Sequence, residues 1–412
     1  MKYLIYFLRL AVGGFFIFSG FVKAVDPMGT GFKMEEYFEV FTGYLPFLNP
    51  LWELCASYAL PISIAMIVFE LVLGLALILG IPRKLTLWGY ALLIGFFTLL
   101  TGFSAYTGKV TDCGCFGDFL KLKPIETFTK DIVLSVLVIL LVLGRKHIVP
   151  FLNKKLSWAL LLLFTVASLG FTMRNYYDLP ILDFRPYKNG ANLCEGKKTE
   201  GLDPGEVLVY YTLENKNTKE SKEVESKQYM TQRLWEDAAW EINKDKTRKI
   251  VVREPQAPKI KDFAIIADGH DIADAMLARE GYQLIVSSYN FDEANQEGFK
   301  RIAAFARQAA EDNVSALGVT NADLSKVESA TEGVYKFYTL DATPIKTMMR
   351  SNPGITLIKN CIVIDKWHHN HLPAWKDVKA KYNINKQNPQ PPLDLAPTDS
   401  TATMQVDTTA VK

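Results

Sequence analysis

The feature that most constrains this chain is a set of long apolar runs confined to residues 1–174. A helix that crosses a membrane needs about 20 predominantly apolar residues. The first run has no small-x-small cleavage site and carries Arg9, so we expect it to be retained rather than removed as a signal peptide. The runs predict five spans: Tyr3–Ala24, Tyr58–Gly80, Leu85–Tyr106, Ile125–Gly144 and Leu156–Met173.

Positive charges between the runs predict their orientation, because Arg and Lys gather on the cytoplasmic side of membrane proteins. They precede the first run and fill the turns after the second and the fourth, whereas three lysines lie on the opposite side. We therefore expect a multi-pass protein of the inner (cytoplasmic) membrane, with its C-terminal soluble half in the periplasm. The inner side has Lys2, Arg83, Lys84, Arg145, Lys146, Lys154 and Lys155, and the outer side has Lys109, Lys121 and Lys123.

All five cysteines lie on the oxidising side in this topology, where disulfides persist. Cys113 and Cys115 belong to "DCGCFGD" (Asp112–Asp118), in the outer loop between the third and fourth runs. A disulfide between cysteines this close closes a small strained ring, which is easily reduced. We therefore predict Cys113 and Cys115 as the catalytic pair of a thiol–disulfide site. The alternative is that each pairs structurally elsewhere, for example with Cys55 or Cys194.

An ionisable residue also lies inside the second run. Glu70 is near its middle, where a carboxylate costs roughly 3 kcal/mol and needs a partner. Arg9 is the nearest partner by depth, and Gly74, one turn beyond Glu70, permits close approach of another helix. Glu70 and Arg9 predict either a site for a quinone or a proton, or a buried ion pair that only joins two helices.

These residues resemble a known family of membrane proteins. Arg9, "SGFVKAVDP" (Ser19–Pro27), Glu70 with its following glycines and "DCGCFGD" resemble the DoxX type, and "CGCFG" resembles its MauE branch, which is associated with methylamine dehydrogenase maturation. "DPMGTGFKMEEYF" (Asp26–Phe38) is similar to a Bacteroidetes form fused to an outer soluble domain. The resemblance covers residues 1–145 and implies a four-helix redox-associated module, with the fifth run as a tether helix.

The soluble half resembles a thioredoxin-like domain, because buried strands alternate with helical patterns from residue 258 onward. Pro353 falls where that family has a cis-proline. The family's Cys-x-x-Cys would lie at the start of the helix that follows the first core strand. Asp292 and Asn295 occupy these two positions, and Asp292 is expected to cap the helix. The resemblance therefore implies a domain for binding or docking, without dithiol activity.

The sequence thus predicts a membrane all-α bundle of four helices plus a tether helix, followed by an extracytoplasmic α/β thioredoxin-like domain. The fold of the segment between them is not indicated. The predicted boundaries are 1–146 for the DoxX/MauE-like domain, 147–176 for the fifth transmembrane helix, 177–257 for the connecting region, 258–385 for the thioredoxin-like domain and 386–412 for a disordered polar tail.

Two other motifs indicate less. Cys361 occupies a hairpin-turn position far from the corner where the family has its dithiol, so we expect an unreactive thiol. "HHNH" (His368–His371) places adjacent histidines on opposite faces of a strand, so we expect no metal site there.

Three functional hypotheses follow. The first is a membrane redox protein that passes electrons by thiol–disulfide exchange, or through a bound quinone, in support of envelope-protein maturation. The second is a non-enzymatic membrane scaffold whose soluble domain docks an envelope protein. The third, a quinol-oxidase accessory subunit, ranks last because His147 lies in a turn and no histidine lies inside a span. The near-neutral net charge of +2 gives no reason to expect nucleic acid, so the expected partners are membrane lipid and an envelope protein.

Overall fold

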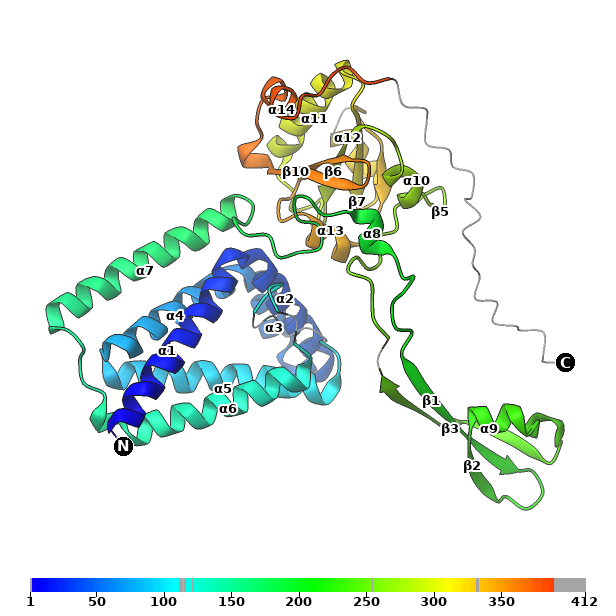
Figure 1. Ribbon diagram of the computed structural model, residues 1–412, viewed down its shortest axis with the longest axis horizontal. Coiled ribbons are helices and arrows are strands. Elements are labelled where there is room, and N and C mark those ends of the chain that lie inside the picture. Colours follow the sequence, from blue (N-terminus) through cyan, green and yellow to red (C-terminus); the bar gives the residue numbers. More distant parts are fainter. Residues whose placement is uncertain are drawn as a thin grey trace. The chain divides into compact units, whose positions relative to one another are not determined.

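A computed structural model gives the architecture of the chain (Figure 1). It describes residues 2–110, 114, 116–120, 122–253, 255–330 and 333–388. Most of the tail that the sequence predicts to be disordered therefore lies outside the described residues. The chain forms two compact units, of which one combines residues 1–192 with 263–412 and the other spans Leu193–Asp262.

Helices dominate the N-terminal part of the first unit (Figure 1). Four of them are long and apolar enough to cross a membrane: α1 (Lys2–Val25), α4 (Ala59–Leu79), α5 (Arg83–Thr107) and α7 (Lys154–Tyr177). These correspond to four of the five predicted spans. The remaining run forms α6 (Pro124–Leu143), which packs beside α5. Its first two turns carry Glu126, Lys130 and Asp131, so α6 does not meet the same criterion, and a fifth span stays a prediction.

Two helices between the first two spans were not expected. They are α2 (Pro27–Tyr44) and α3 (Asn49–Ser57). The start of α2 follows ordinary capping rules, because the Asp26 side chain accepts a hydrogen bond from the Gly29 amide and Pro27 takes the first helical position. Its apolar residues are interrupted by charges and glycines, so no long apolar run marked it in the sequence.

The helices pack through small residues and one shared apolar core. Gly13 of α1 faces Gly74 of α4, and a Cβ on Gly74 would lie 2.8 Å from the carbonyl oxygen of Gly13. The expected close approach at Gly74 is therefore confirmed. Buried aliphatic and aromatic side chains of α1, α4, α5 and α6 fill the space between these helices: Ile5, Leu8, Val12, Phe16, Leu73, Leu77, Leu87, Tyr90, Leu93, Ile94, Leu134, Val138 and Leu141.

The C-terminal part of the first unit is a seven-stranded mixed sheet in the order β10-β9-β6-β7-β8-β4-β5. β6, β7 and β8 are parallel, whereas β9 runs antiparallel to β6. The predicted α/β class is confirmed. The strands are β4 (Ile266–Ala267), β5 (His270–Asp271), β6 (Tyr282–Ser288), β7 (Ser315–Thr320), β8 (Phe337–Thr339), β9 (Gly354–Lys359) and β10 (Ile362–His368), and the helices are α10 (Ala273–Leu277), α11 (Gln296–Glu311), α12 (Leu324–Ala330), α13 (Ala342–Met348) and α14 (Trp375–Tyr382).

Two details of this domain were predicted, and one of them is wrong. The Asn352–Pro353 peptide bond is cis, as expected. The cap of α11, however, is Asn295, whose side chain accepts a hydrogen bond from the Gly298 amide at 2.7 Å. Asp292 lies in the turn before the helix. Asn and Asp cap helices equally well, so residue type alone did not distinguish the two positions.

The second unit is an antiparallel sheet in the order β2-β1-β3, with a short helix against it (Figure 1). Its two long strands are β1 and β3. The elements are α8 (Leu193–Lys197), β1 (Glu206–Asn215), β2 (Ser221–Glu225), α9 (Ser226–Thr231) and β3 (Trp240–Arg253).

Candidate functional site

The loop between α5 and α6 carries the predicted catalytic pair. Cys113 and Cys115 themselves lie outside the described residues. Their neighbours are described: Gly114 separates the two cysteines, and Phe116 and Gly117 follow them at the start of a turn. Both glycines have positive φ angles, of 65° and 50°, which favour glycine over other residues.

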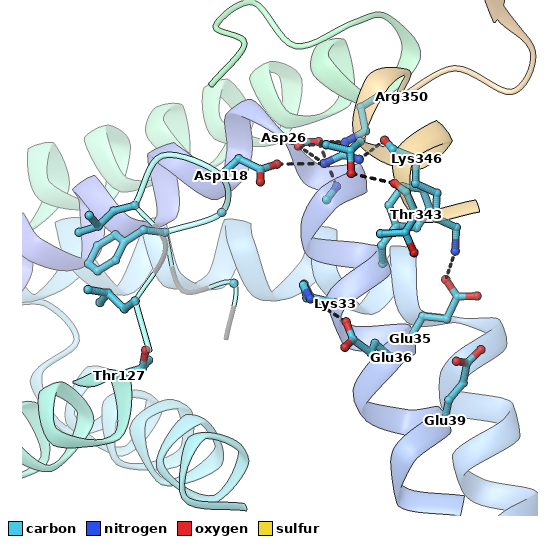
Figure 2. Close-up of a pocket in the computed structure, with 18 residues that line it drawn as sticks. Asp26, Lys33, Glu35, Glu36, Glu39, Asp118, Thr127, Thr343, Lys346 and Arg350 are labelled. Atoms are coloured by element: carbon cyan, nitrogen blue, oxygen red, sulfur yellow. Dashed lines mark hydrogen bonds and ion pairs between the residues drawn. The ribbon is translucent and has the colours of Figure 1, made fainter. Parts of the chain in front are cut away.

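Two cavities meet at this loop. The larger, which we call the outer cavity, has a volume of about 350 Å³ and is lined by α2, the loop and α13 (Figure 2). The smaller, which we call the inner chamber, has a volume of about 30 Å³ and lies among α1, α2, α4 and α5. Gly114 and Lys33 line both. The cysteine loop therefore adjoins an outer cavity on one side and the interior of the helical bundle on the other.

A buried ion pair lines the inner chamber, but it is not the predicted pair. The Lys23 ammonium lies 2.6 Å from a carboxylate oxygen of Glu70, and both side chains are at most 5% exposed. Lys23 also donates to the Ser19 hydroxyl at 3.3 Å and lies 4.8 Å from the centre of the Phe97 ring. The expectation that Arg9 is the partner of Glu70 is therefore wrong.

Arg9 instead joins two chain segments at the other end of α4. Its guanidinium donates to the carbonyl of Ile78 at 3.0 Å and to the carbonyl of Val149 at 2.7 Å. The last carbonyls of a helix have no partner within the helix, so a buried arginine there satisfies them. Ile78 lies eight residues beyond Glu70, or about 12 Å along the helix axis, which is too far for Arg9 to reach both.

The size and lining of the inner chamber decide what can enter it. The Ser63 hydroxyl lines the chamber, is fully buried, and has no hydrogen-bond partner within the described part of the chain. A cavity needs about 10–15 Å³ to hold one water molecule, so the chamber has room for water. Arg9 does not line it, so the two residues predicted together as a quinone or proton site lie apart.

A second buried carboxylate lies below the cysteine loop and was not predicted. Asp131 of α6 is 3% exposed, accepts a hydrogen bond from Thr101 at 2.9 Å and pairs with Lys130 at 2.6 Å. The Lys130 ammonium lies 5.7 Å from the centre of the Phe116 ring, which follows Cys115 directly. The rule that identified Glu70, an ionisable residue inside a predicted span, would also have found Asp131.

One arginine connects the soluble domain to the loop and to the membrane helices (Figure 2). Arg350 follows α13, and its guanidinium binds both carboxylate oxygens of Asp26, at 3.0 and 2.8 Å. The same group lies 3.2 Å from Asp118, three residues after Cys115. The side chain of Arg350 is only 6% exposed. A forked pair of this kind is directional as well as strong, so it fixes the orientation of both carboxylates.

Burial and charge act in opposite directions on this pair. Burial opposes ionisation of Asp26, but the nearby charges of Arg350 and Arg185 hold the pKa of Asp26 below its usual value. Burial likewise opposes the charge on Arg350, yet Asp26 and Asp118 hold its pKa above the usual value. Asp26 and Arg350 are therefore both charged at neutral pH.

An aromatic contact supports the bridge. Phe32 of α2 packs edge-on against Tyr289, with ring centres 5.3 Å apart, and the charged ends of Lys346 and Arg350 lie 4.5 and 5.4 Å from the Phe32 ring. Lys346 also pairs with Glu35 of α2 at 3.6 Å. Tyr289 directly follows β6 and begins the segment that leads to α11. The end of β6 therefore lies beside α2.

One of the structural pairings considered from the sequence is wrong. Cys55 is a free thiol, so it does not pair with Cys113 or Cys115. Cys194 and Cys361 are each disulfide-bonded, and the expected unreactive thiol at Cys361 is wrong.

The histidines of "HHNH" serve the local structure. His369 is buried and its Nδ1 lies 2.9 Å from the Ser351 hydroxyl, next to Pro353. Burial, followed by the charge of His369, lowers the pKa of His368 to about 3, so His368 is neutral at physiological pH. No group of three or more His, Cys, Asp or Glu side chains suited to a metal occurs among the described residues.

The Lys23–Glu70 assignment predicts a specific energetic coupling. We expect Lys23→Met and Glu70→Leu each to cost about 3–5 kcal/mol of unfolding free energy in mixed micelles, because each leaves one buried charge without its partner. The double variant should lose much less than the sum. Arg9→Met combined with Glu70→Leu is the matched control and should be additive to within about 0.5 kcal/mol. Strong coupling of Arg9 to Glu70, with none for Lys23, would contradict the assignment.

The Arg350–Asp26 pair predicts that the defect of a variant without Arg350 becomes smaller as the pH is lowered. Because the folded pKa of Asp26 is lowered, Asp26 stabilises the native protein above its unfolded pKa of about 3.9, and this stabilisation is lost as the pH falls through the folded pKa. In Arg350→Gln the buried Asp26 loses its main cation, so its folded pKa should rise. The defect should then lessen as the pH is lowered from 7 to 5.

Hydrogen exchange of residues 116–120 and of α13 in the full chain measures this defect. At pH 7 we expect Arg350→Gln to speed exchange at least tenfold, and Arg350→Lys to lie between it and the native protein, because lysine keeps the charge without the fork. Arg233→Gln removes an arginine whose side chain is 71% exposed and should change nothing. Unchanged exchange in Arg350→Gln would show that the bridge does not hold the loop.

Comparison with known proteins agrees with the architecture of the N-terminal part. The family described as Methylamine utilisation protein MauE matches residues 1–144. No curated protein and no solved structure matches the chain. The match ends with α6 and covers neither α7 nor the soluble domain. Residues 1–144 are therefore similar to the MauE family, and the four candidate spans among the described residues support a multi-pass membrane protein.

Proposed function

We propose that this chain is a membrane thiol–disulfide protein in which Cys113 and Cys115 exchange electrons with an envelope protein. In the exchange, a thiolate of one protein attacks the disulfide of the other and forms a mixed disulfide. The second thiolate then resolves it, so that one protein ends with two thiols and the other with one disulfide. Two electrons and two protons move in total, and no other oxidant is needed.

The position of Gly114 carries this proposal. It separates the two cysteines in the sequence and lines both cavities. The Arg350–Asp118 contact holds the same loop. A loop that borders both an open cavity and the chamber of the Lys23–Glu70 pair suits a group that must be reached by a partner and must also release a proton.

The thiolate is the reactive form of cysteine, and two lysines, paired with Glu36 and Asp131, lie beside the described residues of the loop. The Lys33 side chain packs against Gly114, with its Cγ 3.2 Å from the place where a Cβ of residue 114 would lie. The Lys130 ammonium lies close to Phe116 on the bundle side of the loop. Glu70, paired with Lys23 in the inner chamber, is the proposed proton site. In this proposal Arg9 has a structural role, through its contacts with the carbonyls of Ile78 and Val149.

The soluble domain supports a second candidate, a non-enzymatic scaffold. We propose that this domain is thioredoxin-like, since its strand order and the cis bond before Pro353 agree with that family. Asp292 and Asn295 replace the family's cysteines, and Asn295 caps α11. The domain itself therefore has no dithiol at that corner. Its role in either candidate is to dock, through Arg350, on the loop that carries the cysteines.

A trapping experiment separates the two candidates. In Cys115→Ser, Cys113 has no resolving partner in the loop, so a mixed disulfide with an envelope protein should accumulate. We expect a band of higher mass on a non-reducing gel that disappears on reduction, with unchanged expression and membrane insertion. Cys55→Ser is the matched control and should give no such band, because Cys55 is a free thiol outside the loop.

The opposite outcome identifies a scaffold. If both single serine variants of the loop are degraded and give no adduct, the cysteines are structural and the redox function is wrong. A single fixed redox state of Cys113 in every growth condition would lead to the same conclusion.

The proposed exchange also requires the topology inferred from the charges. We propose that the N-terminus is cytoplasmic, that α6 crosses the membrane as a fifth span, and that everything after α7 is periplasmic. Its 20 residues make α6 about 30 Å long, which matches the hydrocarbon core of a bilayer. Protease added to intact spheroplasts should remove the chain beyond about Arg174 while a cytoplasmic control stays intact. Protection of the soluble domain, with a periplasmic control digested, would contradict this topology.

A further inference from the structure

The outer cavity is large enough for a ligand and is built from two parts of the chain. Its volume of about 350 Å³ falls within the roughly 300–1,000 Å³ that is usual for binding sites. Helix α2 and the cysteine loop form one part of the lining, and Thr343, Lys346, Thr347 and Arg350 of the soluble domain form the other. The lining therefore exists only because the soluble domain is docked on the loop.

Every cation in the lining already has an acidic partner. Lys33 pairs with Glu36 at 2.7 Å, Lys346 pairs with Glu35, and Arg350 binds two aspartates (Figure 2). An anion entering the cavity would have to break one of these pairs. The cavity therefore discriminates against negative charge.

One carboxylate remains for an incoming group. Glu39 is exposed, lines the cavity beyond Glu35 and Glu36 on the same helix, and has no side-chain partner among the described residues (Figure 2). Among the described residues the lining carries five carboxylates against three cations, which leaves a net charge of −2. A cationic side chain would find a partner at Glu39 without displacing an existing pair.

Apolar side chains form another part of the lining, next to Gly114. Phe32, Phe116, Leu120 and Leu122 contribute apolar surface, and Gly114 brings the backbone between the two cysteines to the cavity. An occupant must therefore present a reactive sulfur, an apolar surface and a positive charge within a few residues. An extended polypeptide segment meets these three requirements together.

From this lining we infer that the outer cavity binds an extended segment of the partner protein and selects segments in which a cysteine is flanked by Lys or Arg. This inference rests on the proposed thiol–disulfide function and adds the substrate class to it. The partner's cysteine would lie at Gly114, and its basic neighbour at Glu39.

Two synthetic peptides test the inference on the full-length Cys115→Ser protein in lipid nanodiscs. Each peptide carries one cysteine activated as a disulfide with an aromatic thiol, and the two differ only in Lys or Glu on either side of the cysteine. The Cys113 thiolate attacks the peptide sulfur and expels the aromatic thiolate, whose absorbance reports the rate. At low salt we expect the Lys peptide to react about tenfold faster, and the ratio to approach one at about 1 M salt.

A pair of variants tests whether Glu39 causes the preference for the Lys peptide. Glu39→Gln should reduce the rate ratio about threefold, since it removes the carboxylate that is free for the peptide. Glu53→Gln removes an exposed acid of α3 that does not line the cavity, and should leave the ratio unchanged. An equal effect of both variants would mean that only overall charge matters, which would overturn the assignment to this cavity.

Different outcomes of this experiment contradict the inference about basic segments and the proposed thiol–disulfide function. If both peptides react rapidly and at equal rates, Cys113 is an accessible nucleophile and the proposed function stands, but the cavity does not select basic segments. If neither peptide reacts with the native protein while both react after denaturation, Cys113 is not accessible to a partner. The proposed function and the inference built on it are then both wrong.

Discussion

The contact of Arg350 with Asp26 and Asp118 is the interaction on which the rest of the site depends. It joins three segments that are far apart in the sequence: the end of α1, the cysteine loop and the end of α13. Removing one partner from a buried pair typically costs 3–5 kcal/mol, because the other charge stays buried. This contact joins the loop to the soluble domain, and together with the Lys346–Glu35 pair and the Phe32–Tyr289 contact it holds the two walls of the outer cavity together.

Asp26 shows how one residue can serve two structures at once. Its side chain caps α2 through the Gly29 amide and also receives the fork of Arg350. The cap fixes where α2 begins, so it also fixes where Phe32 and Glu35 face the soluble domain. Local helix chemistry and long-range docking are thus coupled through a single carboxylate.

The parts of this structure that the sequence predicts are those set by local patterns. Apolar length gives α1, α4, α5 and α7, and alternation of strand and helix patterns gives the mixed sheet. The cis bond at Pro353 and the close packing at Gly74 also follow from residue type and position. These features need no knowledge of which distant residues meet.

Pairing between distant charges is where sequence reasoning fails. The depth of each residue along its span suggested Arg9 as the partner of Glu70. The two helices run antiparallel, however, and the contact of Gly13 with Gly74 sets their register. This register brings Arg9 level with Ile78 and Lys23 level with Glu70. Neither the register nor the Arg350 bridge leaves a periodic signal, because each is one contact between residues that are well separated in the chain.

The soluble domain has no Cys-x-x-Cys, which agrees with the docking role proposed for it. Under the proposed function, a Cys-x-x-Cys at the start of α11 would add a second exchanging pair, and the two pairs would compete for the same partner sulfur. Asn295 instead caps α11. What the domain contributes is α13 and Arg350, and these provide one wall of the outer cavity.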